Sequence, residues 1–438
     1  MEAALNCPCC GRENSVGSNF CVFCGHALNG KTRHKDEAVA VRMRAGHFSV
    51  AAPVIMDGRW FLIDDGGSVI AGLPYRYDMT VRDEVGTFHE GYARVRSGGK
   101  TGYTGMNGEV VIEATYEDGS SCFSDGLVAV RSGEYWGYLN AHGGVAIPFV
   151  FQHADDFSHG MAAVEMNGKW GYIDRAGRTV IPFIFDSAKA FSSGYACVEY
   201  GGGYGFIDMK GFAVPFKGKT GVCGLERIFN FGKSVLAGMP PLKDSEGRYV
   251  LSLPFRKVSS HNGNVAVVVM PGKRGDITDS RRYKYINVSD MDFLDFKSGV
   301  ENDFGTAGDF SEGLAAVSKG KFVEFGKSLW NNYDDLGYIN WRGEVIRSFH
   351  LSRAFPFREG MALVGFRDKG ADHTGYIDKN GKLMLDYDAN EYSLWTGFSN
   401  GLAPIAKRIG GVWKYGYINM KGETVIPIRF DRAGEFGK

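Results

Sequence analysis

The sequence has no excess of either charge. Its 438 residues include 50 Lys and Arg and 50 Asp and Glu, so the formal net charge at pH 7 is zero. Proteins that bind nucleic acid or membrane surfaces by general electrostatic attraction carry a basic excess, and its absence argues against both classes. No run of about 18 apolar residues occurs, so no transmembrane helix is predicted.

Common catalytic motifs are missing as well. There is no G-x-S-x-G, no H-E-x-x-H and no P-loop, and the ten histidines show no paired metal spacing. The N-terminal stretch, MEAALNCPCCGREN, lacks the basic region and apolar run of a secretory signal. We therefore expect a cytoplasmic protein that is not an enzyme and has no catalytic residues.

Glycine, in contrast, is abundant, with 62 residues, because the chain is built from a turn-rich repeat. The clearest copy runs from Phe157 to Phe191 and reads FSHGMAAVEMNGKWGYIDRAGRTVIPFIFDSAKAF. It opens on Phe-x-x-Gly and continues with an apolar strand, a polar turn and a second strand, Trp170 to Asp174. A third strand is predicted to stop at Pro182, which has no N–H for a sheet ladder. An Ala-x-x-Phe hand-over then leads to the next copy.

A Gly-aromatic pair in the second strand marks the copies. The first four pairs are spaced by 35, 34 and 34 residues. Glycine inside a strand marks a bulge or the close approach of another backbone, and we expect an aromatic side chain of a neighbouring repeat to cover it. The pairs are Gly102-Tyr103, Gly137-Tyr138, Gly171-Tyr172, Gly205-Phe206, Gly337-Tyr338, Gly375-Tyr376 and Gly416-Tyr417.

These motifs resemble the bacterial WG-repeat family, also called KWG repeats. Lys169 to Asp174 matches its signature fully, and Trp136 to Asn140 matches it nearly. Most copies depart from the pattern because another residue replaces the Trp. The resemblance implies a β-rich scaffold and no particular chemistry. The replacing residues are Thr101, Tyr204, Leu336, Thr374 and Tyr415.

The predicted fold is all-β, an array of about ten three-stranded repeats that bury their apolar faces against one another. The array covers residues 44–438, and residues 209–305 hold degenerate repeats with irregular loops. It begins and ends with the same hand-over, Ala45/Phe48 and Ala433/Phe436. An array that starts and stops at the same point of the repeat favours a propeller-like ring over an open β-solenoid, because the last repeat of a ring must meet the first.

The N-terminal segment carries the strongest site signal. Two Cys-x-x-Cys pairs, ten residues apart, fit a closed tetrahedral Zn²⁺ site with Cys7, Cys10, Cys21 and Cys24 as ligands. Cys9 is a surplus thiol, and His26 competes weakly for the last position. Disulfides and a redox motif are the alternatives. We predict a zinc ribbon at residues 1–28 and a polar linker at residues 29–43.

The recurring side chains permit a structural or a functional interpretation. The aromatic stripe could stack sugars or bases, but core packing fits better because every repeat has it. The Asp or Asn after the second strand is expected to cap its turn. Cys122, Cys197 and Cys223 are interpreted as small buried residues.

Departures from the repeat are then the candidate binding sites, above all the loops 273–282 and 325–336. The favoured function is a non-enzymatic scaffold that binds a protein partner through the repeat surface and the zinc ribbon. The alternatives are a glycan- or small-ligand-binding protein and, less favoured, a hydrolase with its site in residues 209–305.

Overall fold

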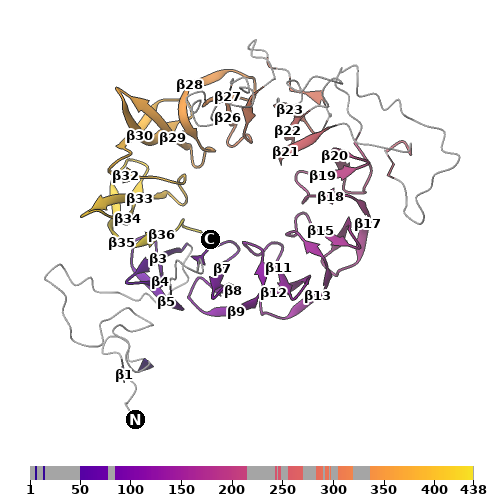
Figure 1. The fold of residues 1–438 in the computed structure, drawn as a ribbon, viewed down its shortest axis with the longest axis horizontal. Coiled ribbons are helices and arrows are strands. Elements are labelled where there is room, and N and C mark those ends of the chain that lie inside the picture. The colour runs from indigo at the N-terminus through magenta and orange to yellow at the C-terminus, as the bar shows by residue number, and fades with distance from the viewer. Residues whose placement is uncertain are drawn as a thin grey trace, which may run out of the picture. The chain divides into compact units, whose positions relative to one another are not determined.

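The computed structural model (Figure 1) describes residues 50–76, 84–214, 255–269, 304–318 and 336–437, with the short segments 5–6, 13–14, 242–243, 245–247, 283–289, 292–294 and 296. The chain divides into two compact parts. The first comprises Met1–Gly133, Leu139–Gly144 and Glu391–Lys438, and the second comprises Glu134–Tyr138 and Val145–Asn390.

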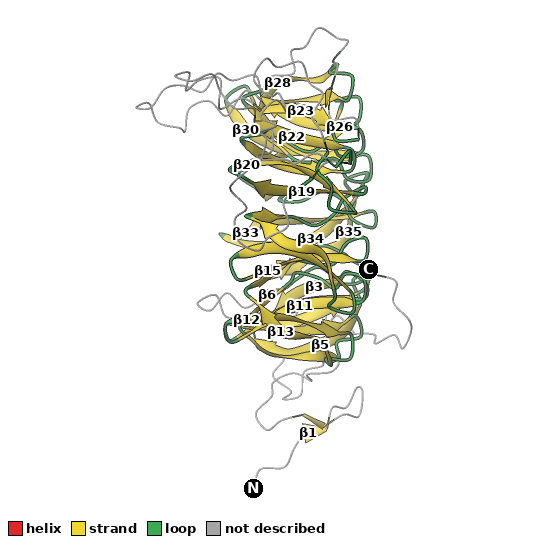
Figure 2. Cartoon of the chain, turned by 90° about the vertical axis from the view of Figure 1, so that its right-hand side faces the viewer, coloured by secondary structure: helices red, strands yellow, loops and turns green. Residues whose placement is uncertain are grey.

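Strands and turns make up the described residues, as Figure 2 shows, so the predicted all-β class is confirmed. In this part of the chain no helix has the length and apolarity to cross a membrane.

The first compact part contains strands of the earliest and latest repeats, with a separate short pair near the N-terminus. Its strands are β1 (Leu5–Asn6), β2 (Glu13–Asn14), β3 (Ala52–Met56), β4 (Arg59–Ile63), β5 (Val69–Arg76), β6 (Glu84–Val85), β7 (Tyr92–Ser97), β8 (Lys100–Gly105), β9 (Val110–Tyr116), β10 (Asp118–Gly119), β11 (Leu127–Ser132), β32 (Tyr392–Ser393), β33 (Leu402–Ile409), β34 (Val412–Asn419), β35 (Thr424–Phe430) and β36 (Arg432–Ala433).

The second compact part contains the repeats between these. Strand β12 (Tyr135–Asn140) has residues in both parts. The other strands are β13 (Val145–Phe151), β14 (His153–Ala154), β15 (Met161–Met166), β16 (Lys169–Asp174), β17 (Thr179–Phe185), β18 (Ser187–Ala188), β19 (Tyr195–Tyr200), β20 (Gly203–Asp208), β21 (Lys257–Asn262), β22 (Val265–Val269), β23 (Tyr283–Asn287), β24 (Asp292–Phe293), β25 (Thr306–Ala307), β26 (Leu314–Ser318), β27 (Leu336–Asn340), β28 (Val345–Ala354), β29 (Met361–Asp368), β30 (Ala371–Asp378) and β31 (Leu383–Asp388).

A regular repeat forms a sheet of four antiparallel strands, not three. The sheet β14-β15-β16-β17 begins with the two-residue strand β14, which comes from the preceding hand-over. The predicted third strand also continues past Pro182. Trp170 pairs with Phe185 and Tyr172 with Ile181, so β17 bulges between these pairs and accommodates the proline.

The bulge explains the strand glycine. A Cβ on Gly171 would lie 2.8 Å from the backbone oxygen of Ile181, on the adjacent strand of the same sheet. The prediction that an aromatic side chain of a neighbouring repeat covers this glycine is therefore wrong: the close approach is by the bulged strand β17.

The core lies between successive sheets. One cluster combines Tyr172 and Phe185 of the β14–β17 sheet with Phe191 and Ile207 of the next repeat. Trp170 packs on the rim of this cluster and is only half buried. Tyr172, at 0% exposure, is the fully buried ring of this strand.

In the first compact part, the end of the chain completes the first repeat (Figure 1). Strand β36 pairs with β3 through Val54↔Ala433 and Ile55↔Arg432. Two backbone hydrogen bonds between Ala51 and Gly437, at 3.0 and 2.9 Å, extend the pairing. The last hand-over thus supplies the first repeat with its short fourth strand. Phe48 lies outside the described residues.

Candidate functional site

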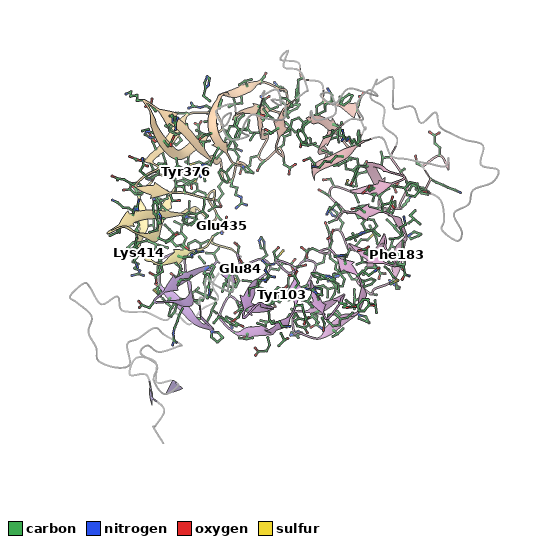
Figure 3. The ribbon with its side chains drawn as sticks, viewed as in Figure 1. Glu84, Tyr103, Phe183, Tyr376, Lys414 and Glu435 are labelled. Atoms are coloured by element: carbon green, nitrogen blue, oxygen red, sulfur yellow. The ribbon has the colours of Figure 1, made fainter. Side chains whose placement is uncertain are left out.

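The aromatic stripe of the repeats is buried. Its six tyrosines and Phe206 are all 0–1% exposed, which confirms core packing over an exposed stacking surface. Tyr103, labelled in Figure 3, belongs to the β6–β9 sheet of the first compact part, and Tyr376 belongs to β30 of the second. An exposed ligand cannot stack on these rings.

Six buried tyrosine hydroxyls have a structural partner in the hand-over that follows them. In the clearest repeat the Tyr172 hydroxyl donates to the Lys189 carbonyl at 2.8 Å, and the Tyr172 ring lies 4.8 Å from the Phe191 ring. Burial raises the pKa of Tyr172, so the hydroxyl stays a donor. We call this arrangement the tyrosine clasp. The same bond joins Tyr103 to Ser120, Tyr138 to Asp155, Tyr285 to Gly308, Tyr338 to Phe355 and Tyr417 to Gly434.

The recurring Asp or Asn caps its turn, as predicted. Asp174 accepts the backbone N–H groups of Ala176 and Arg178 through one carboxylate oxygen, both at 2.9 Å. Hydrogen bonds from the Arg178 side chain and backbone lower the pKa of Asp174. The equivalent residues Asn140, Asp208, Asn340, Asp378 and Asn419 accept the same pair of N–H groups. Their side-chain oxygens therefore bond to the backbone of their own turns.

The recurring tyrosine and turn-capping side chains already bond within the fold. The exposed side chains that differ from one repeat to the next are therefore the candidates for function. In the second compact part Trp341 is 60% exposed, and the Arg342 guanidinium lies 5.1 Å from its ring centre. Val345 follows on β28, and Met384 on β31 is 44% exposed. The turn at Gly381 lies against β28, because the Arg347 guanidinium donates to the Gly381 carbonyl at 3.1 Å.

Strand β31 adds charged groups to this surface. It reads LMLDYD, and its side chains alternate between half-buried and exposed. Asp386 accepts a 2.8 Å hydrogen bond from the His373 ring, and that ring stacks on Phe366 at 5.3 Å between centroids. The Asp386 carboxylate remains 45% exposed. The array of Trp341, Val345, Met384, Asp386 and Asp388 is hereafter the outer surface.

The sequence profile described as "WG containing repeat" matches seven segments of this chain: residues 83–100, 102–136, 136–170, 170–204, 303–321, 337–369 and 415–438. These seven segments are similar to WG repeats. The matched segments include five of the clasp tyrosines but neither Tyr285 nor Tyr376. No protein with a curated description matches the sequence.

Solved structures resemble this chain in fold only. The crystal structure of a eukaryotic initiation factor is 9% identical with a TM-score of 0.51, and the match covers 89% of this chain and 98% of that chain. The C-terminal WD40 domain of Sif2 is 9% identical with a TM-score of 0.35, covering 85% and 90%. Kluyveromyces lactis Hsv2p is 8% identical with a TM-score of 0.36, covering 70% and 98%. The last two likenesses are too weak to indicate anything about this chain.

The predicted site residues fall outside the part of the chain that the structure describes. Cys7, Cys10, Cys21 and Cys24 are outside the described residues, as are the loop 273–282 and all of the loop 325–336 except Leu336. Within the described ranges, no three His, Cys, Asp or Glu side chains gather as a metal site would require.

The remaining cysteines were interpreted as small buried residues. Cys197 is buried, and burial raises its pKa to about 12, so its thiol is a poor nucleophile. Cys122 is only half buried, contrary to the prediction, and Cys223 is outside the described residues.

Sequence reasoning missed the outer surface. Each of its residues is a single departure from the repeat pattern. A single changed residue in a strand is harder to recognise in a sequence than an irregular loop. The usable signal was Asp386, because it occupies the repeat position of Pro182.

Proposed function

We propose that the protein is a non-enzymatic interaction scaffold. It binds a protein partner through the surface of its WG repeats and through an N-terminal zinc ribbon in which Cys7, Cys10, Cys21 and Cys24 hold Zn²⁺. The main support is that the recurring tyrosine hydroxyls and turn carboxylates bond within the fold, so that among the described residues the variable exposed side chains are the groups available to contact other molecules. A reducing cytosol suits four thiolate ligands.

The exposed apolar side chains support a protein partner. Trp341 and Met384 of the outer surface are large apolar groups facing water, and aromatic residues and Met are enriched at protein interfaces. Hydrophobic groups gathered on a surface mark contact sites for macromolecules.

We also propose that the WG repeats close into a propeller-like ring. The pairing of β36 with β3 supports closure, because it joins the last hand-over to the first repeat. A ring removes the unpaired faces that the terminal repeats of an open array would expose.

Glycan binding is the second candidate, and exposed Trp341 is the observation that favours it, since sugars pack on aromatic faces. Burial of the tyrosine stripe removes the wider aromatic surface on which that candidate first rested.

Affinity purification from native lysate separates the two candidates. The scaffold proposal predicts a stoichiometric protein partner with the wild-type chain and its loss with Trp341→Ser. Ile409→Ser is the matched control, because it removes a comparably exposed apolar group from the other compact part. A retained sugar with no protein would favour the glycan candidate and contradict the scaffold.

A further inference from the structure

We propose that the outer edge of β31 binds an extended, basic segment of the partner protein by adding that segment to the sheet as a further strand. The inference rests on the proposed scaffold function and names the docking edge and the chemistry of the partner. Strand addition draws affinity from main-chain hydrogen bonds and specificity from alternate side chains.

The ladder between β30 and β31 defines which backbone groups are available. The Ala389 N–H donates to the Asp372 carbonyl at 3.0 Å, and the register continues through His373↔Asp388 and Gly375↔Asp386. Hydrogen-bonded pairs alternate along an antiparallel ladder, so the N–H and C=O groups of Asp386 and Asp388 point away from β30. In the described part of the chain, no strand pairs with β31 on that side.

Three of the other outer strands are protected by proline. Pro148 in β13, Pro182 in β17 and Pro427 in β35 each remove an N–H from the strand that ends its sheet. Asp386 occupies the same repeat position in β31: it follows Asp378 by eight residues, as Pro182 follows Asp174. This edge therefore keeps a donor that β13, β17 and β35 lack.

The second feature is the charge of the strand. Strand β31 carries two aspartates and no basic side chain. The nearby Arg367 is engaged by Asp372 at 2.9 Å. Lysine or arginine on an added strand would lie opposite the aspartates, and opposite charges across a ladder stabilise pairing.

A second copy of the chain is a poorer occupant than a basic segment. Antiparallel pairing of two β31 edges around a two-fold axis would place the aspartates of both copies along one short ladder. Like charges that face each other across strands destabilise pairing. Exposed Met384, at the start of the strand, offers an apolar contact to alternate side chains of a partner.

The test uses the full-length protein and three labelled peptides in fluorescence anisotropy. The first peptide alternates lysine with valine, the second alternates glutamate with valine, and the third is the basic peptide with alternate backbone nitrogens methylated. We expect the basic peptide to bind at least about tenfold more tightly than either of the others, since both charge and main-chain donors contribute. Equal binding of the methylated peptide, or no binding of the basic one, would overturn strand addition.

Three variants locate the site on the chain. Asp386→Pro should weaken binding of the basic peptide at least about tenfold, because it removes an outward N–H and a carboxylate with the residue that β17 already carries there. Asp388→Asn, which keeps the backbone donors, should weaken it by a smaller factor. Glu113→Pro makes the matched change at the same repeat position in β9 and should leave binding unchanged. Unchanged affinity in Asp386→Pro would overturn the assignment.

Failure of this inference differs from failure of the scaffold proposal. If Asp386→Pro still retains the native partner at full stoichiometry, the scaffold stands and the β31 edge is not the docking site. If the wild-type chain retains no protein partner, the scaffold proposal itself fails, whatever the peptides do.

Discussion

The tyrosine clasp predicts a specific cost for removing one oxygen atom. In Tyr172→Phe the ring can still pack on Phe191, but the Lys189 carbonyl loses a 2.8 Å hydrogen bond. Tyr172 is 0% exposed, but its bond to exposed Lys189 is only part-buried. Losing such a hydrogen bond costs about 0.5–1.5 kcal/mol, and we expect the free energy of unfolding to fall by that amount.

Urea denaturation, followed by the far-ultraviolet circular dichroism of the strands, measures this cost. Tyr135→Phe is the matched control, because Tyr135 is 47% exposed and a surface substitution changes stability by less than about 0.5 kcal/mol. Hydrogen exchange in residues 187–198 should quicken in Tyr172→Phe and stay unchanged in Tyr135→Phe. A midpoint shift no larger than that of the control would refute the clasp as a stabilising element.

Three further predictions follow from burial and from the cysteine spacing. Trp170→Ala should lower the free energy of unfolding, measured in urea, by roughly 2 kcal/mol, which is less than the roughly 3–5 kcal/mol lost with a fully buried ring. Trp341→Ala, at an exposed position, should lower it by under about 0.5 kcal/mol. Equal denaturation midpoints for the two variants would contradict the assignment of Trp170 to the rim of the core. Thr374→Val should raise the unfolding free energy by about 1 kcal/mol, because the buried Thr374 hydroxyl has no hydrogen-bond partner in the described structure; a lower midpoint would show that the hydroxyl is needed. Elemental analysis should find about one Zn²⁺ per chain and none after joint replacement of Cys7 and Cys24 by Ser, with the repeats still folded; metal-free wild-type protein, purified reduced, would contradict the zinc ribbon.

The sequence was sufficient to predict the features that recur. The period, the buried tyrosines and the turn caps each appear in several copies, so their structural role could be inferred before any packing was known. Asp174 shows why: an Asp before a Gly-containing turn bonds the local backbone wherever the repeat places it. Within the region predicted to hold degenerate repeats, Tyr283–Asn287 forms the strand β23.

Features that depend on pairing between distant residues could not be predicted in the same way. The two-residue hand-over strand, such as β14, is too short for a hydrophobic period, so the fourth strand of each sheet went unnoticed. Pro182 looked like a strand end because the bulge that accommodates it exists only in the paired sheet. Tyr285 joins the clasp although Lys284 stands where other repeats have glycine, which hid it from a motif search.

The pairing of β36 with β3 joins the end of the array to its beginning, and the whole description of the fold depends on it. Deleting residues 432–438 removes β36 and Phe436 while keeping Phe430 in the core. The account predicts that amide exchange in residues 51–63 quickens by about 100-fold or more, since the Ala51 N–H loses its acceptor on Gly437 and β3 becomes an edge. Exchange in residues 161–174 of the truncated protein serves as the internal control and should not change. Unaltered protection in residues 51–63 after the deletion would contradict closure of the array through β36.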